Sequence, residues 1–173
     1  MSGAGPPQIL PGLQGGVVWA LVLYENEAPF RLADHAKTYA DISALARSVR
    51  DREIAPEFTI SVGAKIRPVL ILQDRPQGRL PEYAALKLTR LEKLAADDIE
   101  AIRSRRSERF FDLPEPRRFG IKAETAVDLL ALTRVHQSAI VSRPRGKLNA
   151  NEFRVICERL VDVLDLDIAH RVV

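Results

Sequence analysis

The pattern of hydrophobic and polar positions divides the 173-residue chain into short apolar runs separated by longer polar stretches. The run at residues 17–24 follows two glycines and predicts a β-strand that ends at an acidic, proline-containing segment. A second run, at residues 69–72, is continuously apolar, which is typical of a strand buried on both faces. Pro68 has no amide hydrogen to donate, so we expect it at the first position of this strand, with Arg67 at the strand's open end.

The remaining apolar pattern predicts two helices and two further strands. Residues 34–50 carry apolar side chains at helical spacing, and this helix is expected as an insertion between strands. Residues 95–106 form a second helical pattern, with Leu94, Ile99 and Ile102 expected to face inward. Arginines lie at its C-terminal end, where cations suit the helix dipole. Residues 83–89 are expected to form a strand that ends at Thr89, and residues 128–141 one bent strand or two adjacent ones.

The last helix is the clearest prediction. Asn149 is a good N-cap, and Glu152 lies three residues later, which is a variant of the capping box. Several short strands with helical excursions and a packed terminal helix predict an α+β protein, mainly β, built as a small curved barrel and not as a doubly wound sheet. The terminal helix carries a core-facing stripe at helical spacing: Phe153, Ile156, Cys157, Leu160, Val161 and Leu164.

Composition places the chain among globular proteins, with 46% hydrophobic and 28% charged residues. We expect a disordered tail at residues 1–13 and a single domain at residues 14–173. No apolar stretch has the length of a membrane span, and the first residues lack the features of a signal peptide, so we expect a cytoplasmic protein without membrane contact. The single cysteine, Cys157, excludes an intramolecular disulfide and is expected as a small buried hydrophobe, with a catalytic thiol as the weaker alternative.

Two kinds of charged residue are candidates for chemistry. Arg67 is a fixed cation beside a buried strand, where a guanidinium can fork onto a phosphate, although it also fits an ordinary arginine flanking a core strand. The net charge is only +3, but arginines cluster around the aromatic pair at residues 110–111. This combination suits single-stranded nucleic acid, and it also fits a solvated surface whose arginines pair with nearby glutamates. The clustered arginines are Arg103, Arg105, Arg106, Arg109, Arg117 and Arg118.

The histidines give one candidate acid or base. Histidine is a candidate because an imidazole can act as an acid or a base, and strand alternation puts His136 on one face with Arg134 and Ser138. It is either a catalytic group or a hydrogen-bonded structural residue. His35 and His170 have no partners at metal-ligand spacing, and we predict neither a metal site nor a cofactor.

Five short sequence blocks follow one another along the chain between about Gly15 and Leu166. Each block alone is common, whereas the five in this order are specific. The blocks are Gly15-Gly16-Val17-Val18-Trp19-Ala20, Lys65-Ile66-Arg67-Pro68-Val69-Leu70-Ile71-Leu72, Lys87-Leu88-Thr89, Leu132-Thr133-Arg134-Val135-His136-Gln137-Ser138, and Gly146-Lys147-Leu148.

Together these blocks resemble the PemK/MazF family of toxin endoribonucleases. The resemblance implies an SH3-like barrel of the PemK/MazF/CcdB type with helical insertions, a homodimer, and metal-independent cleavage of single-stranded RNA, including mRNA. It also implies a type II toxin-antitoxin system, with a cognate antitoxin protein bound in the RNA groove. The family's essential arginine corresponds to Arg67 and its threonine or serine to Thr89.

The chemistry of RNA cleavage agrees with these roles. Attack by a 2'-hydroxyl requires charge stabilisation on the phosphorane, which Arg67 would supply, while Thr89 would bond a phosphate oxygen. Arginine is a poor base, so another group or a water must accept the hydroxyl proton, with His136 as a candidate. The residues expected to contact RNA are Lys65, Lys87, Arg90, Arg105, Arg106 and Arg109.

The sequence also departs from the family pattern. Ala64 stands where a carboxylate is common, Leu88 replaces a proline, and Arg90 replaces a serine. Residues 34–50 and 92–116 are additions whose role the sequence leaves open. These changes keep two alternatives: a non-catalytic barrel module that binds RNA or inhibits a protein target such as gyrase, and a phage or host regulator that has kept only the dimer interface.

Overall fold

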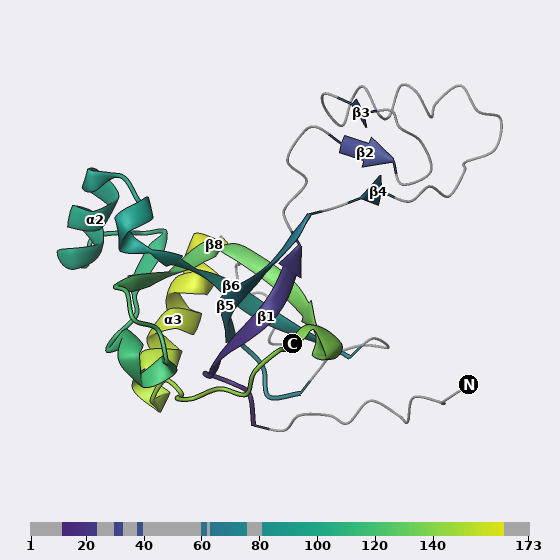
Figure 1. Ribbon diagram of the computed structural model, residues 1–173. Helices are drawn as coiled ribbons and strands as arrows, with labels where there is room; N and C mark the ends of the chain where they lie inside the picture. Colours follow the sequence, from purple (N-terminus) through teal and green to yellow (C-terminus); the bar gives the residue numbers. More distant parts are fainter. Residues whose placement is uncertain are drawn as a thin grey trace, which may run out of the picture. The chain divides into compact units, whose positions relative to one another are not determined.

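The computed structural model describes residues 12–23, 30–32, 38–39, 60–61, 63–75 and 81–164, and the structural statements below concern these residues (Figure 1). The chain divides into two compact units, residues 1–21 with 66–173, and residues 22–65. In the smaller unit, three short strands form an antiparallel sheet in the order β3-β2-β4. They are β2 (Phe30–Leu32), β3 (Thr38–Tyr39) and β4 (Ile60–Ser61).

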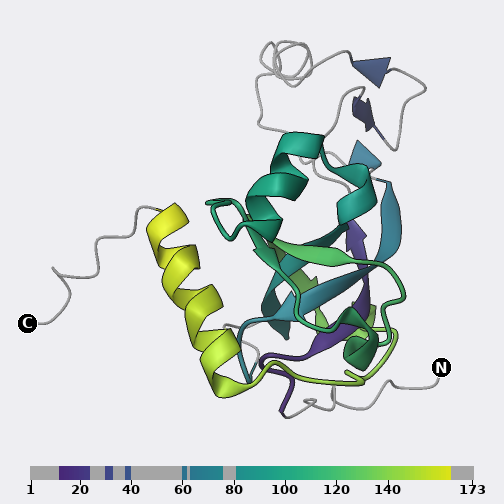
Figure 2. The ribbon, with the colours of Figure 1, turned by 90° about the vertical axis from the view of Figure 1, so that its left-hand side faces the viewer.

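A five-stranded antiparallel sheet in the order β1-β5-β6-β8-β7 is the centre of the larger unit. Two α-helices and three short 3₁₀ helices accompany it, and Figure 2 shows α3 lying along one side of the sheet. The strands are β1 (Val17–Leu23), β5 (Ala64–Ile71), β6 (Glu82–Arg90), β7 (Phe110–Asp112) and β8 (Thr125–His136). The helices are η1 (Leu91–Lys93), α2 (Ala96–Arg103), η2 (Pro116–Phe119), η3 (Gln137–Ala139) and α3 (Ala150–Val163).

The longest ladder joins β6 to β8, from the pair Glu82–His136 to the pair Arg90–Thr125. Its register shifts in the middle, because Leu86 lies opposite Leu132 whereas Leu88 lies opposite Val127. Four residues of β8, 128–131, therefore lie opposite a single residue of β6, Lys87. An irregularity of this kind bends a strand. The bent strand expected at residues 128–141 is confirmed in part, because β8 covers Thr125–His136 and residues 137–139 form a 3₁₀ helix instead.

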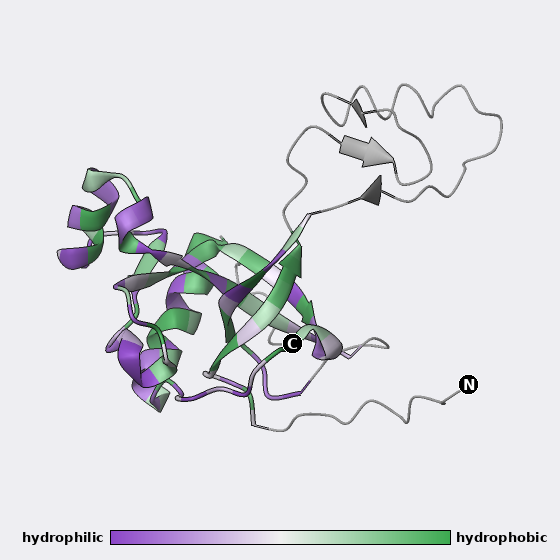
Figure 3. Cartoon of the chain, viewed as in Figure 1, coloured by the Kyte–Doolittle hydropathy of each residue, from purple (hydrophilic) through white to green (hydrophobic). Residues whose placement is uncertain are grey.

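The hydrophobic core lies between this sheet and α3. Leu70 and Leu86 are directly opposite each other on β5 and β6, and both are fully buried. Ile156 of α3 packs in the same cluster and is also fully buried. Figure 3 shows the corresponding hydrophobic colouring along β1 and hydrophilic colouring on the outer turns of α2. Burying aliphatic side chains of this size contributes about 1.5–3 kcal/mol each. The core residues are Val17, Leu70, Leu86, Leu88, Leu113, Phe119, Ile121, Val127, Leu129, Leu148 and Ile156.

Several predictions from the sequence are confirmed. Val69, Leu70 and Ile71 are fully buried, as the continuous apolar run indicated. Ile102 of α2 is buried in a second cluster with Phe110. The helix is shorter than predicted and ends at Arg103, because Arg105 adopts a left-handed backbone conformation (φ 58°) and the amide of Arg106 donates back to the carbonyl of Ala101 at 2.8 Å.

Two predictions are wrong. Pro68 was expected to begin its strand, with Arg67 at the strand's open end, but β5 begins at Ala64 and both residues lie inside it. The missing amide is tolerated because the recorded pairing of β5 with β6 begins one residue later, at Val69. A helix was predicted at residues 34–50, but Thr38–Tyr39 form strand β3, which pairs with β2. A β-branched and an aromatic residue are favoured in strands. The rest of that prediction lies outside the described residues.

Other predictions stand as follows. The α+β class is confirmed, but the five-stranded sheet is not closed, so the SH3-like barrel stays a prediction. Of the tail predicted at residues 1–13, residues 1–11 lie outside the described part, whereas Leu13 is buried and its carbonyl accepts the amide of Gly16 at 2.9 Å. None of the helices in the described part of the chain has the length and apolar character needed to cross a bilayer.

The capping box of α3 gives the first testable prediction. The Asn149 side chain accepts the amide of Glu152 at 2.9 Å, and the Glu152 carboxylate accepts the amide of Asn149 at 2.8 Å. Asn149→Ala is expected to lower the free energy of unfolding by about 1 kcal/mol in urea titrations. Asn149→Asp keeps the acceptor and is the matched control, expected to retain most of that stability. Equal losses in the two variants would contradict this role for the cap.

Candidate functional site

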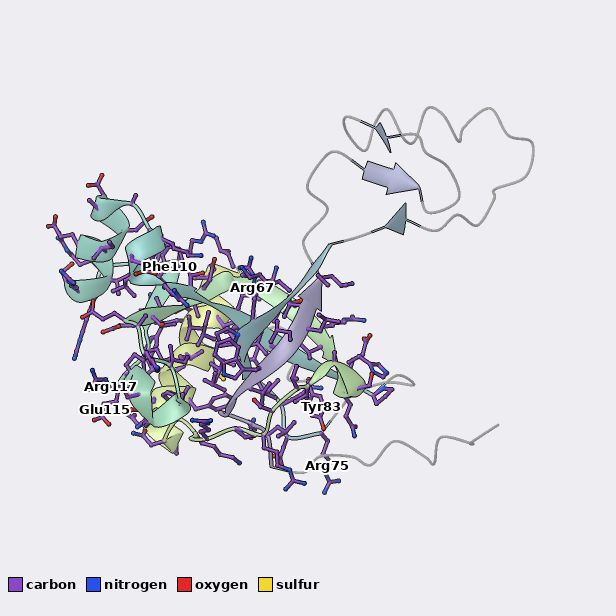
Figure 4. The ribbon with its side chains drawn as sticks, in the orientation of Figure 1. Arg67, Arg75, Tyr83, Phe110, Glu115 and Arg117 are labelled. Atoms are coloured by element: carbon purple, nitrogen blue, oxygen red, sulfur yellow. The ribbon has the colours of Figure 1, made fainter. Side chains whose placement is uncertain are left out.

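The register of two adjacent strands, continued two residues past its last pair, implies that the predicted catalytic pair lies on one face of the sheet. Val69 of β5 lies directly opposite Lys87 of β6, and residues two apart on a strand point to the same face. When this register is continued by two residues, Arg67 lies opposite Thr89. Figure 4 shows Arg67 toward the end of the sheet where α2 lies, and Tyr83 toward the opposite end.

The spacing at this position follows from the hydrogen-bond pattern. The amide of Leu72 donates to the carbonyl of Ala84 at 2.9 Å, which makes this pair a hydrogen-bonded one. Pairs alternate along an antiparallel ladder, so the continued Arg67–Thr89 pair falls on a non-hydrogen-bonded position. Side chains lie closest at such positions, where the Cα atoms are about 4.5 Å apart.

The side chains on this face are partly buried and partly exposed to solvent. Arg67, Lys87 and Thr89 are all half-buried, and Arg67 and Lys87 each make an interaction within the protein. Lys65 lies on the same strand as Arg67 and is exposed. The face therefore combines a guanidinium, an ammonium and a hydroxyl, which is a donor set that suits phosphate oxygens.

No carboxylate accompanies Arg67 on its own strand, because the sequence of β5 is Ala-Lys-Ile-Arg-Pro-Val-Leu-Ile. At the end of β6, Arg90 forms an ion pair with Glu92 at 3.2 Å, and both side chains are more than half exposed. An exposed pair of this kind contributes little to stability. Arg90 is thus held by a local partner at the edge of the candidate face.

His136 lies at the other end of the same ladder from Thr89. It is opposite Glu82, and Thr89 lies seven positions beyond Glu82 on β6, which is about 24 Å along a strand. Its Nδ1 lies 2.7 Å from the Ser138 hydroxyl and accepts the Ser138 amide at 3.2 Å. Within one molecule, the structure does not bring His136 to the candidate catalytic pair, and its ring caps η3 instead.

The predicted RNA-binding arginines have different local roles. Arg109 donates to both carboxylate oxygens of Asp128, at 3.0 and 2.8 Å, and lies over the Phe110 ring at 4.8 Å. The Asp128 side chain is only 8% exposed, so Arg109 neutralises a buried charge. Arg106 contacts Glu100 at 3.6 Å and donates to the Ser104 hydroxyl at 3.0 Å.

Sequence reasoning missed the role of Asp128. Its carboxylate also accepts the amide of Leu130 at 3.2 Å, inside the irregular stretch of β8. An aspartate within an apolar strand was a signal that could have been used, because a buried carboxylate requires a partner. The partner itself, 19 residues away in sequence, could not be chosen from several nearby arginines.

Arg105 and Arg106 line a groove of about 930 Å³ between α3 and the segment of residues 102–114, which we call the α3 groove. Arg159 of α3 crosses it and donates to the carbonyls of Ser107 and Phe110. Burial lowers the pKa of Arg159 from its usual value. The groove is lined by Ile102, Arg105, Arg106, Ser107, Glu108, Phe110, Phe111, Asp112, Pro114, Asn151, Glu152, Val155, Arg159, Asp162 and Val163.

Cys157 is half-buried, less than the sequence indicated. Burial raises the pKa of its thiol, and Glu158 raises it further. A raised pKa keeps the sulfur protonated at neutral pH, which disfavours the weaker alternative of a catalytic thiol. Within the described residues, no group of three or more histidine, cysteine or acidic side chains is arranged to hold a metal ion.

Comparison of the chain with protein-family models and with curated proteins found no match.

The Arg109–Asp128 pair gives a prediction about stability. Arg109→Ala leaves a buried carboxylate without its main partner and is expected to cost about 2 kcal/mol in urea unfolding. The double variant Arg109→Ala with Asp128→Asn removes the charge and is expected to recover part of this loss. Arg103→Ala is the matched control: its ion pair with Glu124 is exposed, so the loss should stay below about 0.5 kcal/mol. Equal losses for Arg103→Ala and Arg109→Ala would contradict this role.

Asp112 gives a prediction about pH. Burial raises the pKa of this carboxyl, Glu124 raises it further, and Arg105 and Arg103 oppose the shift. A carboxyl with a raised pKa in the folded state stabilises the fold at low pH, and this contribution is lost as pH rises through the folded-state pKa. Asp112→Asn should therefore increase stability at pH 7, and the gain should shrink toward about pH 3.5, measured by urea unfolding. An equal gain in the free energy of unfolding at pH 7 and at about pH 3.5 would contradict this effect of Asp112.

Proposed function

We propose that the protein is a metal-independent endoribonuclease that cleaves single-stranded RNA by attack of a 2'-hydroxyl on the adjacent phosphate. The observation that carries this proposal is the common face of Arg67, Lys87 and Thr89 on adjacent strands, implied by the register of β5 on β6. Arg67 and Lys87 are positively charged hydrogen-bond donors that can bind phosphate oxygens. The Thr89 hydroxyl can both donate and accept a hydrogen bond. They suit a reaction whose transition state carries added negative charge on phosphate oxygens.

Each residue has a stated role. The Arg67 guanidinium binds two phosphate oxygens and strengthens its hold as the phosphorane gains charge. The Thr89 hydroxyl donates to a phosphate oxygen and keeps the 2'-oxygen, phosphorus and leaving 5'-oxygen in line. Lys87 adds a second cation, and Lys65 and Arg90 lie at the edge of the face for the flanking phosphates. The attacking 2'-hydroxyl passes its proton to solvent water. The bond from phosphorus to the 5'-oxygen breaks and that oxygen takes a proton from water, so the products are a 2',3'-cyclic phosphate and a 5'-hydroxyl.

The PemK/MazF resemblance supports a finer proposal. We infer that the sheet belongs to an SH3-like barrel, that the chain acts as a homodimer in the cytoplasm, and that it is the toxin of a type II system restrained by a cognate antitoxin. The supporting features are the order of the elements that carry the five sequence blocks: β1 after the glycine pair, the Arg-Pro strand β5, β6 with Thr89, β8, and the terminal α3.

A second candidate function is a non-catalytic module that binds RNA or a protein target such as gyrase. The observation that favours it is that His136, the predicted acid or base, lies about 24 Å along the ladder from Thr89. The departure from the family pattern at Ala64, the first residue of β5, where a carboxylate is common, favours it as well. A protein of this kind would bind single-stranded RNA without cutting it, or would inhibit its target with no RNA present.

The test uses a long single-stranded RNA incubated with the purified chain in EDTA, with new ends mapped and their chemistry identified. Defined cuts ending in 2',3'-cyclic phosphates are expected from the wild type. Arg67→Ala should reduce the rate by at least about 100-fold, since a charged donor to the transition state is lost. Thr89→Val should reduce it by roughly tenfold, the loss of one hydrogen bond.

Arg154→Ala is the matched control, because this exposed arginine pairs with Glu158 on α3 and lies outside the candidate face. Its cleavage rate should equal that of the wild type. Unchanged cleavage by Arg67→Ala would remove Arg67 from the mechanism. No cleavage by the wild type, together with binding of the same RNA, would favour the non-catalytic module.

A further inference from the structure

The α3 groove has an elongated shape. Its lining residues on α3 run from Asn151 to Val163, which is about 18 Å of helix at 1.5 Å per residue. They include Asn151, Val155, Arg159 and Asp162, spaced three or four residues apart, so one face of the helix borders the groove along nearly its whole length. A groove of this length suits a segment of polymer better than a compact small molecule.

The groove is partly apolar. Phe110 and Phe111 of β7 line one side of the groove, together with Pro114 two residues beyond that strand. Val155 and Val163 of α3 line the other side. Phe111 and Val163 are only partly buried, although both pack against the core cluster. Apolar side chains left partly open in a groove are the usual anchors for an amphipathic partner.

Some of the charged side chains that line the groove have a hydrogen-bond or ion-pair partner among the described residues, and others do not. Arg159 is held by backbone carbonyls, and Arg106 by Glu100 and Ser104. Glu152 serves the α3 capping box and pairs with Arg118. Among the described residues, no hydrogen bond or ion pair reaches the side chains of three groove carboxylates or of one groove arginine. The carboxylates are Glu108, Asp112 and Asp162, and the arginine is Arg105.

We propose that the α3 groove binds a basic, amphipathic polypeptide segment, with apolar side chains on the phenylalanine and valine lining and lysines or arginines facing Asp112 and Asp162. Charge complementarity favours this partner over RNA, because four carboxylates against three arginines line the groove, and Asp112 and Asp162 have no hydrogen bond or ion pair among the described residues. Cationic partner side chains would stabilise the ionised form of Asp112, whose pKa is raised in the free protein. The proposal does not depend on RNA cleavage, because no lining residue of the groove belongs to the Arg67, Lys87 and Thr89 face.

The test measures peptide binding to the full chain by fluorescence anisotropy and by amide chemical shifts. The probe is a fluorescein-labelled 14-residue helical peptide of leucine and lysine, with leucines at positions i, i+3, i+4 and i+7; a helix of this length spans about 21 Å. A matched peptide with every lysine replaced by glutamate and a labelled oligouridylate are the comparison ligands. The leucine-lysine peptide should bind at micromolar concentration, at least tenfold more tightly than the leucine-glutamate peptide, and should shift the amides of Phe111 and Val155.

Two variants separate the groove from general charge attraction. Asp162→Lys and Glu158→Lys make the same charge change on exposed residues of α3, but only Asp162 lines the groove. Asp162→Lys should weaken peptide binding at least tenfold, and Glu158→Lys by less than twofold, with both variants checked for folding by circular dichroism. Equal effects of the two variants, equal binding of both peptides, no binding at millimolar peptide, or groove shifts caused by the oligouridylate would each overturn the proposal.

Discussion

The ladder between β6 and β8 is the constraint on which the larger unit depends. β6 pairs along its length with β8 on one edge and with β5 on the other, so it is the strand that connects the two halves of the sheet. Leu86 and Leu88 point from it into the core beneath α3. The backbone bonds of this ladder fix the register, and a slip by one residue would move these leucines to the opposite face. The Arg67 and Thr89 face depends on β6 directly, and the α3 groove depends on it through β8, which pairs with β7.

The irregular stretch of β8 connects the ladder to the α3 groove. Residues 128–131 are accommodated opposite a single residue of β6, and β7 pairs with β8 at this point, where Phe110 lies opposite Asp128. Asp128 accepts bonds from Arg109 and from the amide of Leu130, which fixes the bend and the segment that begins β7. Arg159 then ties the same segment to α3 through the carbonyls of Ser107 and Phe110. The bend, the buried ion pair and the groove thus form one structural unit.

Local patterns predicted the parts of the fold that local forces determine. The Asn149 and Glu152 capping box, the buried run at residues 69–71 and the face of Ile102 all follow from short-range spacing. The strand at Thr38–Tyr39 was missed because its pairing with β2 outweighs the helical pattern around it. The resemblance named Arg67 and Thr89 as a pair, which stays a prediction, whereas the separation of His136 from Thr89 depends on which end of an antiparallel ladder each residue occupies. The roles of Arg109 and Arg159 depend on tertiary partners, and spacing along the chain does not reveal them.

The central claim is that Arg67 and Thr89 face each other across β5 and β6. The most direct test is a nuclear Overhauser experiment on the isotopically labelled chain, measuring contacts between the Hα protons of these two residues. Non-hydrogen-bonded antiparallel pairs have Cα atoms about 4.5 Å apart, so the account predicts a strong Hα–Hα cross-peak between Arg67 and Thr89, in series with one between Val69 and Lys87. A cross-peak from Thr89 to the Hα of Ile66 or Pro68 in its place would put Arg67 on the other face and contradict the account.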